Sequence, residues 1–188
     1  MKLDSRLETL VVTVHLAALS LALGPPIFFG AVVAPAVFRV LPTRDMAGAL
    51  QSPILSSLCV MAEVSFLVLF GTAWLLTGSG AAKLTRSLLT RLPILGFFAA
   101  IVIRQLLIPQ IDKIRQEASG LIDSLPVGDP SRLALDRYHR LATGFFSIEI
   151  AAALLVLFAT ARLLTARRAA PPVVAVAAPR PAPKILDL

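Results

Sequence analysis

TLVVTVHLAALSLALGPPIFFGAVVAPAVF, residues 9–38, is a run of thirty residues without a charged side chain. About 20 apolar residues are enough for an α-helix to cross the hydrocarbon core of a bilayer. Three further tracts each contain a single charged residue: residues 46–82 with Glu63, residues 92–109 with Arg104, and residues 141–161 with Glu149. The sequence therefore predicts an all-α, polytopic membrane protein built as a bundle of four transmembrane helices.

The composition indicates one membrane domain and no separate soluble domain. The 188 residues are 57% hydrophobic and 15% charged, with a mean hydropathy of +0.83. Soluble domains carry about 25% charged residues. We assign residues 1–168 to the four-helix transmembrane domain. Residues 169–188 are rich in Ala and Pro and show no helical period, so we expect a disordered tail.

The net charge of +7 has its simplest explanation in the membrane. Lys and Arg flank transmembrane helices and set their orientation, so the lipid bilayer is the predicted partner and nucleic acid is not. Cys59 is the single cysteine and stands inside an apolar tract. It cannot form an internal disulfide, and the chain has no cysteine-based metal motif.

Prolines and capping residues set the expected helix boundaries. The first helix covers about residues 7–41, and Pro25 and Pro26 should kink it because neither donates a backbone N–H. The other three helices are predicted at about residues 52–76, 86–108 and 130–166, the last with Asp129 as its N-cap.

An extramembrane amphipathic helical segment is predicted between the third and fourth helices. It either stands alone or continues the third helix beyond the lipid. Its apolar face combines Ile111, Ile114, Ala118, Leu121 and Ile122.

Charge counts at the two ends of the bundle predict its orientation. Four spans place both termini on one side, which holds ten Lys and Arg residues against seven on the other side. The positive-inside rule therefore predicts cytoplasmic termini, in the plasma (inner) membrane if the chain is bacterial.

Three ionisable residues of the apolar tracts fall at similar depths, on a helix rise of about 1.5 Å per residue. They are Glu63, Arg104 and Glu149. An unpaired charge at mid-membrane is costly, so we expect Arg104 to pair with Glu63 or Glu149. The remaining glutamate would be protonated or hydrogen-bonded. Such a polar layer either fixes helix register or forms a site for ions, protons or a small ligand; lipid-facing snorkelling of Arg104 is the third alternative.

Two histidines are candidate site residues. His139 lies near the membrane surface that faces away from the termini, where it would line the mouth of a pocket or hydrogen-bond a loop carbonyl. His15 lies in an apolar tract near the opposite surface, roughly 20 Å away at 1.5 Å per residue, so a haem held by both is not expected. One axial histidine with a different second ligand stays open, as does an interhelical hydrogen bond by His15.

The sequence carries no nucleophile elbow, no zinc-protease motif and no phosphate-binding loop. This favours a role that is not enzymatic.

Three short segments form a recognisable series. They are GAVVAPAVF at residues 30–38, followed by RVLP and the pair Ala47 and Gly48; LIP at residues 107–109, followed by Ile111 and Arg115; and YHR at residues 138–140. In order and spacing, these segments resemble the DUF4149, or TMEM205-like, family of small four-helix membrane proteins. The resemblance implies a helical membrane domain without an established biochemical activity. Tyr138 and Ala142 stand where the family usually has Leu and Ser.

The first helix, with His15 and a proline-containing stretch, is also similar to copper-resistance D-type and HemJ-type membrane proteins. This second resemblance implies haem or metal handling, with His15 or His139 as the ligand.

Three functions follow as hypotheses. The first is permeation of a small solute, an ion or protons through the layer of Glu63, Arg104 and Glu149. The second is a haem- or metal-binding redox protein. The third is a non-catalytic subunit, in a homo-oligomer or a larger membrane complex, whose polar layer is structural.

Overall fold

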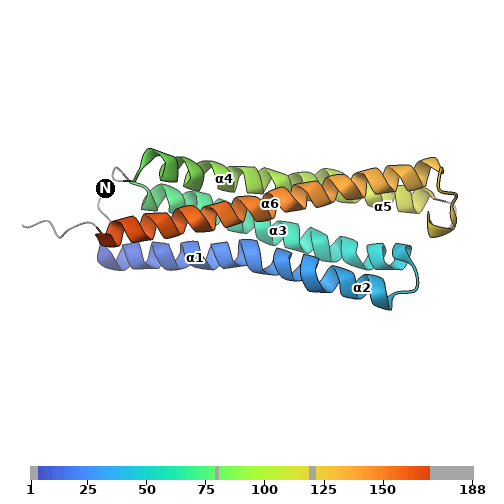
Figure 1. Ribbon diagram of the computed structural model, residues 1–188, viewed down its shortest axis with the longest axis horizontal. Coiled ribbons are helices and arrows are strands. Elements are labelled where there is room, and N and C mark those ends of the chain that lie inside the picture. Colours follow the sequence, from blue (N-terminus) through green and yellow to red (C-terminus); the bar gives the residue numbers. More distant parts are fainter. Residues whose placement is uncertain (1–3, 79–80, 119–121, 170–188) are drawn as a thin grey trace, which may run out of the picture.

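The computed structural model describes residues 4–78, 81–118 and 122–169, and the regular elements of these ranges are all helices. They form four long helical rods and one short turn of 3₁₀-helix, as Figure 1 shows. The first rod joins α1 (Ser5–Phe28), η1 (Phe29–Val33) and α2 (Ala34–Val40); the second is α3 (Arg44–Leu76); the third joins α4 (Lys83–Val102), η2 (Ile103–Leu107) and α5 (Ile108–Glu117); the short turn is η3 (Ile122–Ser124); the fourth rod is α6 (Pro130–Ala169).

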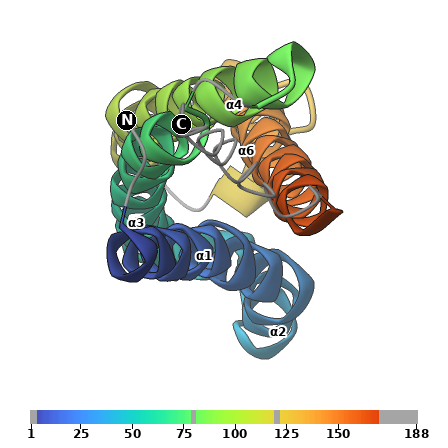
Figure 2. The same ribbon diagram turned by 90° about the vertical axis from the view of Figure 1, so that its left-hand side faces the viewer.

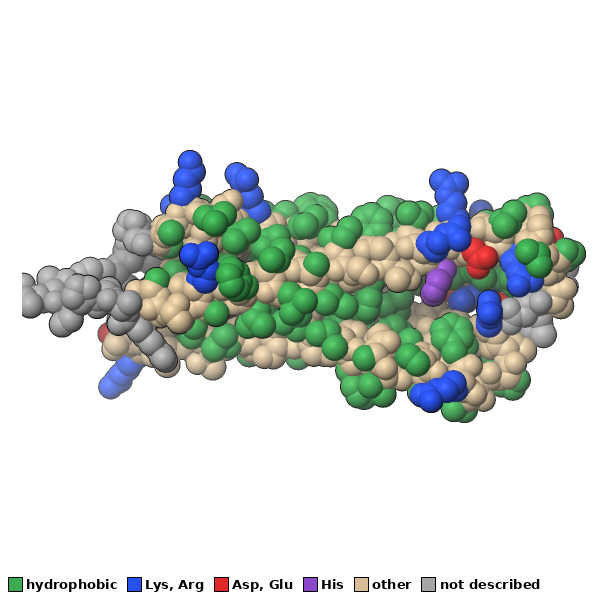
Figure 3. All heavy atoms as spheres, in the orientation of Figure 1, with side chains coloured by type: hydrophobic (Ala, Val, Ile, Leu, Met, Phe, Trp, Pro, Cys, Tyr) green, Lys and Arg blue, Asp and Glu red, His purple; other side chains and the backbone are tan. Residues whose placement is uncertain are grey.

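All four rods are long and apolar enough to cross a membrane. Figure 3 shows Lys and Arg side chains near the two ends of the molecule and a broad band of hydrophobic side chains between them. Many large apolar side chains on the outside are exposed, including Phe28, Leu67 and Phe98. This pattern is typical of a bundle surrounded by lipid. The predicted four-helix membrane bundle is confirmed.

The bundle has two different ends. We call the end where α1 begins and α3 and α6 finish the proximal end, and the end with the α2–α3 turn and the α5–α6 connection the distal end (Figure 1). Viewed from the proximal end, α1, α3, α4 and α6 surround a common axis, whereas α2 projects away from α6 (Figure 2).

Helix starts follow the capping chemistry of the sequence. Asp129 Oδ1 accepts a hydrogen bond from the backbone N–H of Ser131 at 2.8 Å, as expected of an N-cap. The predicted start of the second helix is wrong, because α3 begins at Arg44. The Thr43 hydroxyl accepts from the backbone N–H of Met46 and caps the helix there.

The third rod continues beyond the expected end near residue 108, and α5 forms the first part of the predicted amphipathic segment as its continuation. The helix ends at Glu117, so Ala118, its C-cap, and Ile122, in η3, lie beyond it. Ile111 and Ile114 on its apolar face are half-buried. Leu121, assigned to the same face, lies outside the described residues. So does almost all of the tail expected at residues 169–188, of which the structure describes only Ala169.

Two π-helical segments interrupt the first and third rods, and each ends two residues before a proline. The backbone N–H of Ala34 donates to Phe29 O, and that of Ile108 donates to Ile103 O, so each bond spans five residues. Pro35 and Pro109 come next and donate no N–H, so each rod has one fewer ordinary helical bond there. Such π segments occur frequently at functional sites.

The first rod stays α-helical through Pro25 and Pro26 as far as Phe28. The change of direction that Figure 1 shows lies between α1 and α2, around η1. The predicted position of the kink, at Pro25 and Pro26, is therefore wrong. The rod bends a few residues later, at the π segment η1.

Candidate functional site

The intramembrane polar layer forms as an ion pair plus an isolated acid. Arg104 Nε lies 2.7 Å from Glu63 Oε1, and Nη2 lies 2.8 Å from Oε2, a two-point contact between η2 and α3. The Gln105 amide lies 3.0 Å from Nη2 and accepts a hydrogen bond when its oxygen faces the guanidinium. The expected pairing of Arg104 with a carboxylate is confirmed, and Glu63 is the partner. Its role in binding a ligand or an ion stays a prediction.

Glu149 is the glutamate left without the arginine. Its side chain is 1% exposed, and Oε2 has no hydrogen-bond partner among the described residues. The fully buried thiol of Cys59 lies within electrostatic reach of Glu149, Glu63 and Arg104, so the layer is shared by α3, η2 and α6. A buried carboxyl oxygen without a partner is unusual in native structures, which makes Glu149 a candidate site residue.

His15 is sealed inside the proximal half of the bundle. Its Nδ1 lies 2.7 Å from Thr72 Oγ1 and its Nε2 lies 3.0 Å from Thr160 Oγ1. The three side chains link α1, α3 and α6, which confirms the expectation of an interhelical hydrogen bond. Both ring nitrogens are therefore engaged by hydroxyl groups. The haem or metal role of His15 stays a prediction. Among the described residues, no three or more Cys, Asp, Glu or His side chains form a group that could hold a metal ion.

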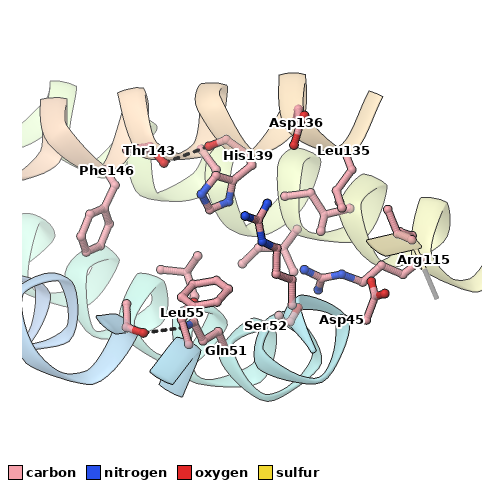
Figure 4. Close-up of a pocket in the computed structure, with 18 of the residues that line it drawn as sticks. Asp45, Gln51, Ser52, Leu55, Arg115, Leu135, Asp136, His139, Thr143 and Phe146 are labelled. Atoms are coloured by element: carbon pink, nitrogen blue, oxygen red, sulfur yellow. Dashed lines mark hydrogen bonds between the residues drawn. The ribbon is translucent and has the colours of Figure 1, made fainter. Parts of the chain in front are cut away.

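A cavity of about 700 Å³ opens at the distal end, between the first rod, α3, α5 and α6 (Figure 4). This volume falls in the range of about 300–1,000 Å³ typical of small-molecule sites. We call it the distal pocket. Its polar and charged lining residues are Arg44, Asp45, Gln51, Ser52, Arg115, Arg132, Asp136, His139 and Thr143; its apolar lining includes Phe29, Phe38, Leu55, Ile108, Ile111, Leu135 and Phe146.

His139 turns its ring into the distal pocket from α6, as Figure 4 shows. This is the pocket-lining position predicted for it, although a role in pH-dependent activity stays a prediction. The cavity does not reach Glu149, which is absent from its lining. Its deep wall includes Phe29 and Phe146, whose rings meet edge to face with centroids 6.2 Å apart. Glu149 follows Phe146 by three residues, a little less than one helical turn.

Sequence reasoning named His139 and missed the other polar lining residues as site residues, among them Arg115. Arg115 reaches into the pocket from α5 (Figure 4), and its guanidinium lies so close to Gly48 that a Cβ there would fall 1.8 Å from Nη2. Its Nε is buried without a hydrogen-bond partner among the described residues, and Nη1 lies 3.7 Å from Asp112. The signal was present in the sequence, since Gly48 and Arg115 both belong to the segments that carry the family resemblance.

Those segments converge on one place. Lining residues come from all three of them: Gly30, Ala34 and Phe38 with Gly48 from the first, Ile108, Ile111 and Arg115 from the second, and His139 from the third. Segments more than 100 residues apart thus surround a single cavity, which makes the distal pocket the best-supported candidate site among the described residues.

Comparison with known proteins gives a family and no activity. A family model described as a domain of unknown function, DUF4149, matches residues 17–119, more than half of the chain. This range contains the first two of the three segments around the pocket. No curated protein and no solved structure matches the chain.

Proposed function

The chain belongs to the DUF4149 family, and from that premise we propose that it lets a small solute permeate the membrane. The solute enters the distal pocket and reaches the polar layer of Glu63, Arg104 and Glu149 when the contact between Phe29 and Phe146 opens. The observation that carries the proposal is the pocket itself. Its deep aromatic wall stands within one helical turn of Glu149, the buried acid with an unpartnered oxygen.

The aromatic wall suits the role of a gate. Phe29 is the first residue of the π segment η1, and a Cβ added at the neighbouring Gly30 would stand 3.8 Å from the Phe146 ring, an ordinary van der Waals distance. A side-chain rotation of Phe146 would join the pocket to the region of Glu149. Rotamer changes of this kind are far faster than rearrangements of whole helices.

The polar layer offers a passing solute two kinds of partner. Glu149 Oε2 takes a hydrogen bond from a donor, and the carboxyl group in its protonated form gives one. Arg104 offers a positive charge, and two hydrogen bonds to the Glu63 carboxylate hold its guanidinium in place. A site at mid-membrane with such groups lowers the cost of bringing a polar solute across the hydrocarbon core.

Thiol labelling at position 149 tests the passage without knowledge of the solute. In a Cys59→Ala background, Glu149→Cys is exposed to a small, charged thiol reagent added at the distal surface of the membrane. Adding Phe146→Ala should raise the labelling rate by roughly tenfold or more, the factor that follows from about 1.4 kcal/mol of easier opening. Phe98→Ala is the matched control, because Phe98 is 57% exposed and does not line the pocket. An unchanged rate, or an equal rise with Phe98→Ala, contradicts the proposal.

The proposal places the distal end outside the cell and the proximal end in the cytoplasm, as the excess of Lys and Arg near the termini favours. Reporter fusions in the α3–α4 and α5–α6 connections should therefore report opposite sides, the second one outside. Reports from the same side would contradict the four-span topology, and reports exchanged between the sides would place the distal pocket on the cytoplasmic side.

A further inference from the structure

The lining of the distal pocket changes from charged to apolar in the same direction on three separate elements. Along α6 the lining residues run from Arg132 and Asp136 through His139 to Phe146; along α3 from Arg44 and Asp45 through Gln51 and Ser52 to Leu55; along α5 from Arg115 to Ile111 and Ile108. In each case the charged end is distal and the apolar end lies toward the middle of the membrane. A molecule that matched this lining would have a charged head and an apolar tail.

The charged end of the pocket carries an excess of cationic groups. Three arginines, Arg44, Arg115 and Arg132, line it against two aspartates, Asp45 and Asp136. Arg115 has an N–H group that a ligand could satisfy: its Nε is buried without a partner among the described residues, and its Nη1 lies 3.7 Å from Asp112 Oδ1. Burying a guanidinium N–H without an acceptor is costly, so an acceptor on a ligand would stabilise the arrangement.

The dimensions favour a single chain. Lining residues on α6 extend from Arg132 to Phe146, fourteen residues or about 21 Å at 1.5 Å per residue. The cavity volume of about 700 Å³ over such a length makes the pocket long and narrow.

The pocket also opens sideways. Because α2 packs on α3 and projects away from α6, the distal half of the bundle is hollowed between α2 and α6, on the face that Figure 3 shows. A ligand can therefore enter from the surrounding lipid as well as from water.

We propose that the solute of the distal pocket is an anionic amphiphile with one alkyl chain, an inference that rests on the proposed function and names its substrate class. The carboxylate or phosphate head lies at Arg115 and Arg132, beside His139. The chain lies along Leu55 and Ile108 and ends at Phe29 and Phe146. Fatty acids and lysophospholipids share this chemistry.

Protection of a thiol in the pocket tests this assignment. In a Cys59→Ala background, Thr143→Cys places a cysteine in the pocket lining, and its labelling by a charged reagent is followed in lipid nanodiscs. Oleate and a lysophosphatidylglycerol with the same chain are compared with oleyl alcohol, which lacks the anion, and with phosphatidylglycerol, which has two chains. Protection by either single-chain anion at concentrations at least tenfold below those of oleyl alcohol and phosphatidylglycerol supports the assignment, and the more effective of the two identifies the source.

Charge variants localise the head. Arg115→Gln should weaken protection by the anion about tenfold, the usual scale for losing one charge-assisted hydrogen bond, and leave oleyl alcohol unaffected. Gly48→Ala displaces the Arg115 guanidinium without removing its charge and should weaken the same ligand. Arg39→Gln is the matched control, since Arg39 lies at the same end, exposed and outside the pocket.

Three results overturn the assignment. Equal protection by oleate and oleyl alcohol would describe an apolar site without head selectivity; protection by phosphatidylglycerol alone would exclude a single chain; and no protection by any ligand would exclude the class. The labelling of position 149 through the Phe146 gate uses none of these ligands. The assignment can therefore fail while the passage stands, and the passage can fail while the pocket still binds the anion.

Discussion

The proximal and distal halves of the bundle use the same residue types in opposite ways. In the proximal half, His15 is buried with both ring nitrogens held by threonine hydroxyls. In the distal half, His139 is exposed and lines an open cavity. Two glycines repeat the contrast. Gly96 makes room for the ring of Phe66, which is 0% exposed, and Gly48 makes room for the guanidinium of Arg115, the far end of a long and flexible side chain.

The difference teaches where this chain is rigid and where it has room for a ligand. The proximal half satisfies its polar groups internally and packs rigid rings against helix backbones, as the hydrocarbon surroundings require. In the distal half, the buried Nε of Arg115 has no hydrogen-bond partner among the described residues, and the pocket leaves open volume between the same four rods. The layer of Glu63, Arg104 and Glu149 lies where the two halves meet.

Arg104→Ala at this boundary should cause the largest loss of stability among the variants considered. It leaves the Glu63 carboxylate at mid-membrane without its partner, and protonation of Glu63 would recover only part of the loss. Lys113→Ala is the control, because Lys113 is 64% exposed and its carboxylate partner Glu117 lies 3.8 Å away on the same helix. Thermal unfolding in detergent compares the two. Similar melting temperatures would show that the ion pair between α3 and η2 contributes little to stability.

Gly96→Ala should destabilise the proximal half by about 1–3 kcal/mol, the usual cost of overpacking a core. Its Cβ would fall 2.3 Å from Phe66 Cζ, and the buried ring has no free direction in which to move. Gly71→Ala is the matched control, since nothing lies within 4 Å of a Cβ there, and it should be neutral or stabilising by up to about 1 kcal/mol. Equal effects of the two changes on thermal unfolding would remove the distinction between packed and open glycines.

His15→Leu should cost about 1–2 kcal/mol, because it removes two interhelical hydrogen bonds, each worth about 0.6 kcal/mol on average in membrane proteins, together with some packing. His139→Leu should change stability by less than about 0.5 kcal/mol, since the ring lines a cavity and supports no described interhelical bond. Chemical unfolding in mixed micelles measures both. A larger loss of stability with His139→Leu than with His15→Leu would show that His139, and not His15, holds the helices together.

Gly48→Ala should have the smallest effect on stability, within about 0.5 kcal/mol, because the guanidinium tip it displaces can swing into the pocket. The contrast with Gly96→Ala is the sharpest form of the comparison, because the same substitution meets a rigid ring in one half and a flexible side chain in the other. The denaturation midpoints of Gly48→Ala and Gly96→Ala, measured under the same conditions, test this contrast. A loss at Gly48 as large as that at Gly96 would mean that Arg115 is fixed and the distal half is as rigid as the proximal half.

Much of this architecture could be predicted from the sequence. Charge-free tracts of sufficient length predicted the four spans, and the cost of a lone guanidinium at mid-membrane predicted the pairing of Arg104. Depth alone could not choose between Glu63 and Glu149, because the choice depends on how α3 and α6 are rotated about their axes. Sequence alone could not name the partners of His15 either, since the threonines that hold it lie 57 and 145 residues away.

The distal pocket was harder to foresee. Its lining includes Phe29 and Gly30 of the π segment η1, whereas the Pro25 and Pro26 pair, the more conspicuous signal, is accommodated inside α1. It also depends on a contact between Gly48 and Arg115, two residues that belong to different rods. Helical periodicity describes one helix at a time and contains no information on such a meeting.

One measurement tests the central claim, that the distal half holds a solute-accessible pocket and the proximal half is sealed. In a Cys59→Ala background, a charged thiol reagent is applied to each side of the membrane in turn. The labelling rate of Thr143→Cys is then compared with that of Thr160→Cys. Thr143 lines the pocket, whereas Thr160 is 3% exposed beside His15. We predict that position 143 reacts from the distal side only, at least about tenfold faster than position 160 from either side. Equal rates at the two positions, or faster labelling of position 160, would contradict the account.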